Sequence, residues 1–233
     1  MREMIDQLAP EPGVVFTRND ALKWFNHHYP KVKDGTVSAH LLRFSTNSRS
    51  RHHYSARPDE DLLYQLDQGR FRRFDPATDP APLDEPVAGE DPGDADEDAP
   101  NDIGEFAYEK DLRSFLARNL ELVEPGLQLY EEEGITGVEF PVRGRFADLL
   151  GVDADGRLVV IELKVSRGYD RVIGQLLRYM AWISKHQAEP DQGVRGMIVA
   201  REISEDLQLA CSSIPDVRLF EYELAVSVRR ITI

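Results

Sequence analysis

The chain has 233 residues, of which 41% are hydrophobic and 30% charged, and its formal net charge is −14. This composition excludes a fibre or a wholly disordered polymer and suits one large or two small soluble domains. The longest apolar runs fall far short of the ~20 residues that span a bilayer, and residues 1–20 lack the features of a secretion signal. Cys211 is the single cysteine and cannot form an internal disulfide. We therefore predict a cytoplasmic protein with no membrane partner.

The negative charge is distributed unevenly along the chain. Residues 1–74 carry 12 Lys or Arg against 9 Asp or Glu, residues 75–102 carry none against 11, and residues 103–233 carry 16 against 22. The middle block has almost no large apolar side chain, so it cannot offset the entropy of ordering it. We therefore predict an N-terminal module (1–75), an acidic disordered linker (76–102) and a C-terminal domain (103–233). The linker's charge either keeps it extended or competes with nucleic acid for the basic module.

Two helices and a hairpin are predicted in the N-terminal module. Thr17 and Asp20 resemble a capping box that begins a helix over residues 18–28, and a second helix begins at about residue 35. Two strand-like stretches then flank the loop Asp67-Gln68-Gly69, which is typical of a hairpin. Two helices followed by a basic hairpin resemble a winged helix-turn-helix, whose second helix enters the major groove of DNA. We therefore predict a small α+β module that binds nucleic acid.

Eight side chains of this module are predicted to contact nucleic acid. They come from the polar face of the second helix, the basic stretch that follows it and the hairpin. They are Thr36, His40, Arg43, Asn47, Arg49, Arg51, Arg72 and Arg73. The basic stretch also holds His52, His53 and Arg57, and it either binds phosphate or forms an ordinary solvated loop.

Two strand-like stretches in the C-terminal domain bring acidic side chains together. They flank residues 153–156, and a three-residue loop ending in a left-handed Gly156 sets Asp148 directly across from Glu162. A two-residue loop would place the two carboxylates on opposite faces of the sheet. Glu162 and Lys164 share a face because they lie two residues apart on one strand. The sequence therefore predicts two carboxylates and one ammonium group in a single patch.

This patch is suited to a divalent cation. Facing carboxylates repel each other, burial of their charge is costly, and a cation relieves both problems. Ligation by oxygen alone favours Mg²⁺ or Mn²⁺ over zinc. The alternative is that Glu162 and Lys164 form the solvent-facing half of an amphipathic strand. The almost continuous apolar run over residues 159–165 opposes that alternative, because it is typical of a strand buried on both faces.

Two predicted helices add further polar candidates. Glu109 interrupts the apolar stripe of a helix over about residues 104–120, so it either pairs with a buried Arg or faces a polar pocket, and we favour the pocket. Gln175 and Tyr179 lie one turn apart on a helix over residues 170–185 and can reach the same spot. They also fit a boundary residue and a core aromatic.

These segments carry a family resemblance. Asp148, then Glu162-Leu163-Lys164, then Gln175 with Tyr179 resemble the motifs of the PD-(D/E)XK nuclease superfamily, and the Gln-x-x-x-Tyr element is similar to its RecB-like branch. The resemblance extends over about residues 105–231 to the catalytic domain of the NucS (EndoMS) endonucleases. It implies an α/β fold of the restriction-endonuclease type, with a mixed sheet flanked by helices. Strands predicted at 194–200 and 217–222, around a helix at 204–212, agree with this class.

The resemblance also implies a chemistry, which is metal-dependent hydrolysis of phosphodiester bonds in DNA. Asp148 and Glu162 would bind Mg²⁺ or Mn²⁺ with the carbonyl oxygen of Leu163. Lys164 would orient or deprotonate the attacking water. Because flanking carboxylates keep a Lys protonated, we expect Lys164 to position the water.

The remaining members of the motif have supporting roles in this resemblance. Glu109 would position a water ligand of the metal, and Gln175 and Tyr179 would border the substrate groove. The N-terminal domain of the NucS family has no visible counterpart here, so mismatch specificity does not carry over. A homodimer would suit the cutting of both strands of a duplex.

The sequence leaves two other functions open. One is a catalytically inactive DNA-binding or regulatory protein that uses the nuclease fold as a scaffold. An intact set of two acids and a Lys argues against it, because an inactive site has little reason to retain buried charges. The other is a nuclease that acts on RNA, which no feature of the sequence excludes.

Overall fold

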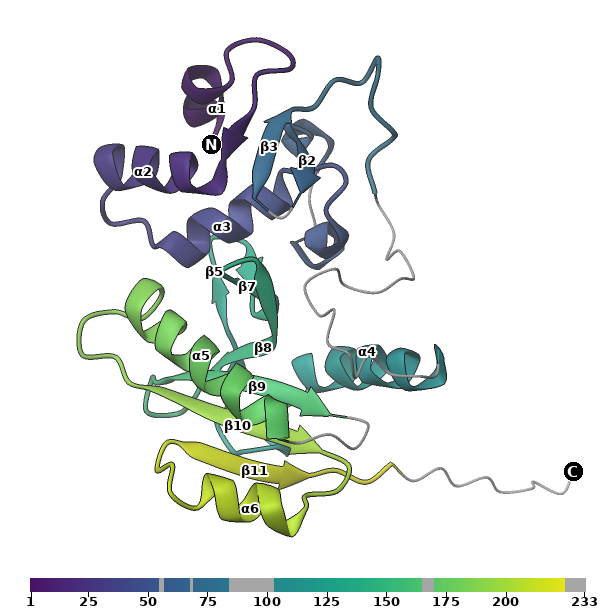
Figure 1. Cartoon of the computed structure of the whole chain (residues 1–233), viewed down its shortest axis with the longest axis vertical. Coiled ribbons are helices and arrows are strands. Elements are labelled where there is room, and N and C mark those ends of the chain that lie inside the picture. Colours follow the sequence, from purple (N-terminus) through teal and green to yellow (C-terminus); the bar gives the residue numbers. More distant parts are fainter. Residues whose placement is uncertain (55–56, 68, 84–102, 165–169, 225–233) are drawn as a thin grey trace, which may run out of the picture.

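The computed structural model of the chain describes residues 1–54, 57–67, 69–83, 103–164 and 170–224. Within these residues the N-terminal region and the C-terminal domain each form a β-sheet with helices packed against it, so the predicted α/β class is confirmed (Figure 1). No helix in the described ranges is long and apolar enough to cross a membrane.

The N-terminal region contains the two predicted helices and the predicted hairpin. The capping box of Thr17 and Asp20 is confirmed by reciprocal hydrogen bonds. In the hairpin, Asp67 pairs directly with Arg70, and a bulge follows Gln65, so the connection is shorter than the predicted three-residue loop. A first helix and a short strand, which the sequence did not indicate, complete the region. Its elements are α1 (Arg2–Leu8), β1 (Phe16–Thr17), α2 (Arg18–His28), α3 (Asp34–Arg43), the 3₁₀ helices η1 (Arg49–Tyr54) and η2 (Pro58–Glu60), β2 (Leu63–Asp67) and β3 (Arg70–Arg73), with sheet order β1-β3-β2.

The segment predicted as a linker is partly folded. The carboxylate of Asp79 is buried and pairs with Arg72, and Leu83 N donates to Thr46 O at 2.8 Å. Residues 76–83 therefore pack against the N-terminal region, and the prediction of disorder from residue 76 was wrong for this part. The ion pair and the backbone hydrogen bond hold this part in place, and composition alone does not reveal such specific contacts. Residues 84–102 lie outside the described residues.

The C-terminal domain is built on a mixed sheet. Its strand order is β11-β10-β9-β8-β4, and β7 also pairs with β8. Strands β9, β10 and β11 run parallel, whereas β8 runs antiparallel to β4, β7 and β9. The elements are α4 (Ile103–Ala117), η3 (Leu120–Leu122), β4 (Gln128–Leu129), β5 (Glu131–Glu132), β6 (Ile135–Thr136), β7 (Val138–Val142), β8 (Arg145–Val152), β9 (Leu158–Lys164), α5 (Asp170–His186), β10 (Val194–Ala200), α6 (Glu205–Cys211) and β11 (Val217–Glu221).

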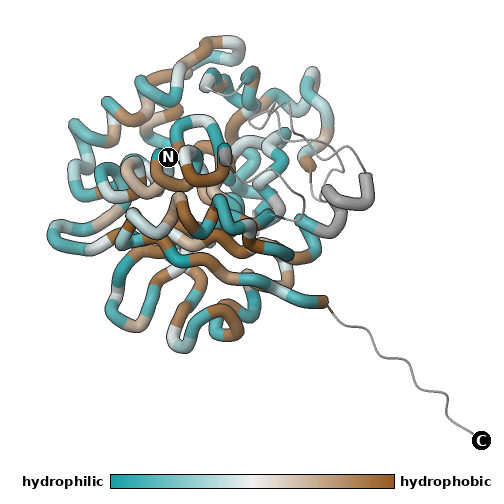
Figure 2. Tube along the Cα trace, turned by 60° about the horizontal axis from the view of Figure 1, so that its bottom comes forward, coloured by the Kyte–Doolittle hydropathy of each residue, from teal (hydrophilic) through white to brown (hydrophobic). Residues whose placement is uncertain are grey.

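Helices cover both faces of this sheet. Along β9, Leu158 and Val160 pack in the cluster that holds the apolar residues of α5 and α6, whereas Val159, Ile161 and Leu163 pack with those of α4. Figure 2 shows the resulting hydrophobic strands in the interior of the domain and hydrophilic turns around them. The almost continuous apolar sequence of β9 thus reflects burial on both faces, as predicted.

Helix α3 belongs to two cores at once. Val37 and Leu41 pack in the core of the N-terminal region, whereas Ala39 and Leu42 pack in the main core of the C-terminal domain. Figure 1 shows α3 lying against the edge of the C-terminal domain beside β5 and β7. The two regions therefore share one helix as a common packing element.

The polar side of this junction is equally close. Thr36 Oγ1 donates to Glu132 Oε2 at 2.9 Å. A Cβ atom at Gly35 would lie 2.1 Å from Oε1 of Gln187, which is fully buried, so the approach of α3 needs a glycine there. Because apolar and polar contacts both cross the junction, we expect the two regions to unfold together.

This expectation can be checked with the two tryptophans. Trp24 lies in α2 and Trp182 in α5, so the variants Trp182→Phe and Trp24→Phe each leave one reporter. Urea unfolding followed by fluorescence should give the same midpoint for both reporters. Leu42→Ala opens a cavity where α3 meets the C-terminal core and should reduce the free energy of unfolding by about 2–5 kcal/mol. Both midpoints should therefore fall together. Separate midpoints for the two reporters would contradict a shared core.

Candidate active site

The turn between β8 and β9 sets the register of the site. Gly156 has φ +78°, and Asp153 N donates to Arg157 O at 2.9 Å, which confirms the predicted three-residue loop. The strand pairing continues regularly from this loop towards the site. The last pair is Leu149 with Ile161, and this register continued by one step would set Asp148 opposite Glu162. In such a pair the Cβ atoms lie about 5 Å apart, and the shared patch of the two carboxylates stays a prediction.

Asp148 is held by two donors at this position. Its Oδ2 accepts a hydrogen bond from Leu163 N at 2.8 Å, and its Oδ1 accepts one from Arg113 Nη1 at 2.9 Å. Only 8% of Asp148 is exposed. The carboxylate is thus fixed against the backbone of β9 on one side and a guanidinium group on the other.

Glu162 is held by a side chain of helix α5. Only 1% of Glu162 is exposed, and its Oε2 accepts a hydrogen bond from Gln175 Nε2 at 3.0 Å. Gln175 Nε2 also lies 3.3 Å from Tyr179 Oη, so the two side chains meet as the one-turn spacing predicted. Tyr179 is 1% exposed and packs in the core. Gln175 therefore orients Glu162 from inside the fold and Tyr179 contacts Gln175, and their place beside the substrate stays a prediction.

A third carboxylate, which the sequence analysis missed, lies beside Asp148. Glu139 in β7 lies between the pairs Val138↔Leu149 and Phe140↔Ala147, and so beside Asp148. It has φ +46°, a conformation that is uncommon for residues with a side chain. Val138 packs on the α4 side of the sheet and Phe140 on the α5 side, although residues two apart in a regular strand share a face. The left-handed residue between them therefore reverses the faces of β7.

Arg113 in α4 compensates the charges of Glu139 and Asp148, and the sequence analysis missed it too. Its Nη2 lies 2.6 Å from Glu139 Oε1, while Nη1 contacts Asp148, and 14% of its side chain is exposed. Burial lowers the pKa of Arg113, but Asp148, Glu139 and Glu109 outweigh burial and raise it. The guanidinium group therefore stays charged.

Glu109, one turn before Arg113 on α4, is half-buried and contributes to this electrostatic cluster. The preference for a polar pocket was therefore incomplete, because Glu109 also interacts with a buried Arg, which was the alternative. Its i, i+4 spacing to Arg113 was the signal in the sequence.

The donor set fits a divalent metal ion of the Mg²⁺ type. Asp148 and Glu162 offer carboxylate oxygens from the adjacent strands β8 and β9, and such oxygen ligands suit Mg²⁺ or Mn²⁺. Among the described residues, no three His, Cys, Asp or Glu side chains form a cluster that would hold an ion by themselves. A backbone oxygen such as that of Leu163, water or substrate would complete the ligand shell. Lys164 is half-buried at the end of β9, and the loop that follows it lies outside the described residues.

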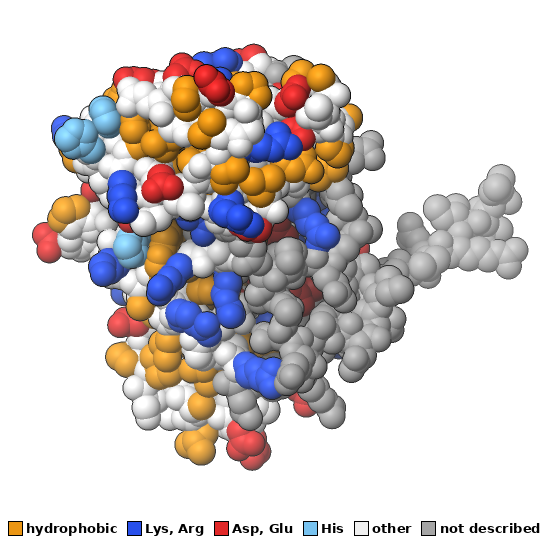
Figure 3. Space-filling model, turned by 45° about the horizontal axis from the view of Figure 1, so that its top comes forward, with side chains coloured by type: hydrophobic (Ala, Val, Ile, Leu, Met, Phe, Trp, Pro, Cys, Tyr) orange, Lys and Arg blue, Asp and Glu red, His pale blue; other side chains and the backbone are white. Residues whose placement is uncertain are grey.

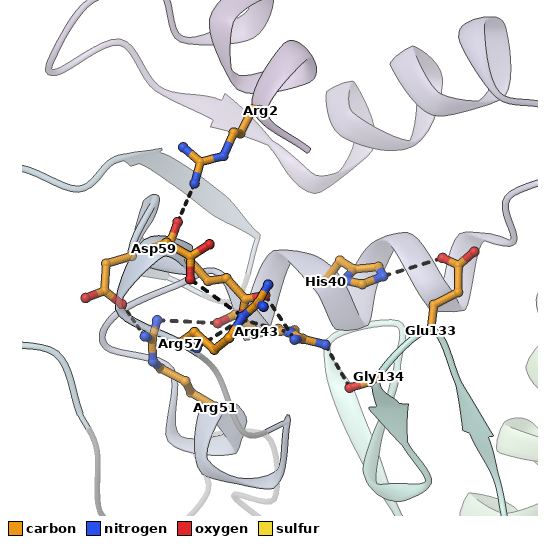
Figure 4. A network of polar contacts seen from close by, with 10 residues as sticks. Arg2, His40, Arg43, Arg51, Arg57, Asp59, Glu133 and Gly134 are labelled. Atoms are coloured by element: carbon orange, nitrogen blue, oxygen red, sulfur yellow. Dashed lines mark hydrogen bonds and ion pairs between the residues drawn. The ribbon is translucent and has the colours of Figure 1, made fainter.

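The predicted contacts of α3 with nucleic acid lie inside the molecule. Thr36 is buried against the C-terminal domain. Arg43 donates to Glu60 and to Gly134 O, and His40 faces Glu133 (Figure 4). This corrects the prediction that the polar face of α3 enters a DNA groove, because that face packs against the C-terminal domain.

Most of the other predicted contacts are also engaged within the chain. Asn47 forms two hydrogen bonds with the backbone of Gln65. These bonds join the segment just before η1 to β2. Arg51 is buried and pairs with Asp61. Figure 4 shows Arg51 within the network of polar contacts. On β3, Arg72 pairs with Asp79 and Arg73 with Asp6. Arg49 is exposed.

Comparison with known proteins gives the C-terminal domain a family context. Residues 108–213 match a family model described as the Endonuclease NucS C-terminal domain, and residues 1–73 match a domain of unknown function, DUF7669. The resemblance to NucS endonucleases is therefore confirmed for this domain. Endonuclease NucS of Pyrococcus abyssi is 31% identical over 98 residues, which cover 42% of this chain and 35% of the relative. Endonuclease NucS 2 of Halobacterium salinarum is 34% identical over 101 residues, which cover 43% and 36%.

Solved structures give matches of the same kind. A repair endonuclease from Pyrococcus abyssi aligns with a TM-score of 0.41 and 25% identity over 55% of this chain and 49% of that one. EndoMS in a complex with double-stranded DNA aligns with a TM-score of 0.41 and 24% identity over 50% and 46%. The chain thus matches about a third of the length of its curated NucS relatives and about half of each structure.

Removal of Arg113 should destabilise the protein strongly. Arg113→Met leaves the carboxylates of Glu139 and Asp148 without their shared cation, which should lower the free energy of unfolding by about 3–5 kcal/mol. Arg118→Met is the matched control, because Arg118 is exposed on the loop directly after the same helix and should change stability by less than ~0.5 kcal/mol. Urea unfolding followed by tryptophan fluorescence measures both. Equal stability of the two variants would contradict a compensating role for Arg113.

Proposed function

We propose that the protein is a metal-dependent DNA endonuclease whose C-terminal domain hydrolyses phosphodiester bonds. The observation that supports this most strongly is the burial of both Asp148 and Glu162 in adjacent strands, at the point where the β8–β9 register continued by one step would bring them opposite each other. Lys164 lies two residues further along β9. The NucS family match over residues 108–213 supports the same chemistry. Restriction, repair or defence against foreign DNA would each use such an activity.

The residues of the site would divide the work as follows. Asp148, Glu162 and the carbonyl oxygen of Leu163 would hold Mg²⁺ or Mn²⁺. Such an ion, when bound, lowers the pKa of a coordinated water and stabilises the charge that develops on the phosphate. Lys164 would orient the attacking water, since its ammonium group is a donor at the same edge of the sheet. Glu109 would position a second water from α4.

Substitution of either acidic ligand tests this proposal. Asp148→Asn and Glu162→Gln keep the shape of the side chains but remove a negative oxygen ligand. A loss of about 4 kcal/mol of transition-state stabilisation would reduce cleavage ~10³-fold. DNA affinity should stay equal or rise, because each change removes negative charge near the phosphate backbone.

The assay needs a broad panel of substrates. Single-stranded, duplex, branched and modified DNA, with one RNA duplex, should be incubated with Mg²⁺ or Mn²⁺, and chelator serves as the control. Lack of turnover by the wild-type protein on every substrate would contradict the proposal and favour a binding or regulatory protein. Cleavage of RNA alone would contradict the choice of DNA.

We propose that the exposed face of α5 supplies much of the DNA contact. Arg171, Arg178 and Lys185 lie seven residues apart and are exposed, so they form one stripe with a spacing of about 10 Å. Arg178 and Lys185 make no ion pair within the described part of the chain. Figure 3 shows Lys and Arg side chains gathered on one face of the molecule. The stripe begins in the first turn of α5, the helix that follows β9 in the chain, and it ends beside α3. A duplex along it would therefore reach both regions.

Charge removal on this stripe should weaken DNA binding in a salt-dependent way. Each of Arg178→Gln and Lys185→Gln should reduce the slope of log affinity against log salt by about 1, as loss of one phosphate contact does. Fluorescence anisotropy of labelled duplex between low and physiological salt measures this slope. Arg118→Gln, near the end of α4 on the opposite face of the sheet, should leave it unchanged.

A variant of the N-terminal region provides the comparison. Arg49→Gln tests the predicted contact of that region which the structure leaves exposed. An unchanged slope for both α5 variants, with a reduced slope for Arg49→Gln, would contradict the placement of DNA along α5.

A further inference from the structure

A chain of polar contacts joins the N-terminal region to Asp148, the proposed metal ligand. His53 in η1 has its Nε2 3.0 Å from Glu139 Oε2. The other oxygen of Glu139 binds Arg113, and Arg113 in turn binds Asp148. Each of these side chains is at most 21% exposed, so solvent competes weakly for the contacts. The chain crosses from η1 to β7, then α4 and then β8.

The start of this chain is anchored firmly. Tyr54, the residue after His53, is 2% exposed and packs in the main core of the C-terminal domain. Burial, with a smaller contribution from Glu139, raises the pKa of Tyr54, so the phenol stays neutral. The 3₁₀ helix η1 therefore sits on the C-terminal domain by an apolar anchor, and His53 has a defined position over Glu139.

The end of the chain determines the orientation of a metal ligand. Arg113 divides its two terminal nitrogens between Glu139 and Asp148. If Glu139 moved or lost its charge, Arg113 would be compensated mainly by Asp148 and would hold that carboxylate more tightly. A cation would then compete less well for Asp148. The left-handed conformation at Glu139 is consistent with a residue placed by its surroundings for a specific role.

We propose that Glu139 and His53 are positioning residues for the metal site, so that the N-terminal region completes the nuclease centre from outside the NucS-like domain. This inference rests on the proposed function, because it assigns Asp148 to the cation. Glu139 sets how strongly Arg113 competes for Asp148. His53 fixes Glu139 through a hydrogen bond from its Nε2–H.

Calorimetric titration of the full chain with Mn²⁺ tests the proposal without reference to activity. Partners in the outer shell of a metal ligand typically account for 10- to 100-fold in affinity, so Glu139→Gln should weaken Mn²⁺ binding within about this range. His53→Ala should weaken it by about 10-fold, the lower end of that range. His53→Gln, which keeps a donor, should restore affinity close to that of the wild-type protein.

A second interdomain histidine provides the matched control. His186 Nδ1 lies 2.8 Å from Asp34 Oδ2, so this pair also joins the C-terminal domain to the N-terminal region, but it has no contact with Glu139 or Arg113. His186→Ala should bind Mn²⁺ as the wild-type protein does. Steady-state cleavage should show a lower kcat with an unchanged KM for DNA in His53→Ala, because only the metal site is altered.

The outcomes separate this inference from the proposed function. Wild-type affinity for Mn²⁺ in His53→Ala and Glu139→Gln would overturn the inference, as would an equal loss in His53→Ala and His186→Ala, which would indicate a general effect of domain contact. Absence of Mn²⁺ binding by the wild-type protein would overturn the proposed function itself. If Glu139→Gln fails to fold, the comparison of His53→Ala with His53→Gln decides the question.

Discussion

Compensation of buried carboxylates is the physical constraint on which the site depends. Glu139, Asp148 and Glu162 lie on the three neighbouring strands β7, β8 and β9, where burial of a carboxylate without compensation would be costly. Arg113 supplies one positive charge to two of them, and Gln175 supplies a donor to the third. Contacts within the chain therefore compensate each of these carboxylates, and the proposed metal would compete with those contacts for Asp148. The same charges that explain the fold therefore define the proposed chemistry.

The placement of α3 changes the meaning of the N-terminal region. In a winged helix the second helix of the pair would be exposed to DNA, whereas here both faces of α3 are committed to packing. The region consequently acts as a structural extension of the C-terminal domain, and η1 brings His53 to Glu139. Two sequence families on one chain can thus contribute to one centre.

Sequence reasoning succeeded where the signal was local. Gly156 fixed the turn and with it the register of β8 with β9 as far as Leu149 and Ile161, and Thr17 with Asp20 marked the start of α2. It missed Glu139 and Arg113, because their positions depend on the β7–β8 register and on a left-handed residue that no glycine marks. It also placed the face of α3 in solvent, since a polar side chain that bonds across a domain junction has the same pattern as an exposed one.

The most direct measurement is a crystal structure of the wild-type protein soaked in Mn²⁺, with anomalous diffraction to locate the ion. The account predicts a peak bonded to one carboxylate oxygen each of Asp148 and Glu162, at about 2.1 Å as for hard cations with oxygen ligands. A peak elsewhere, or no peak with Asp148 still bound only to Arg113 and Leu163, would contradict it.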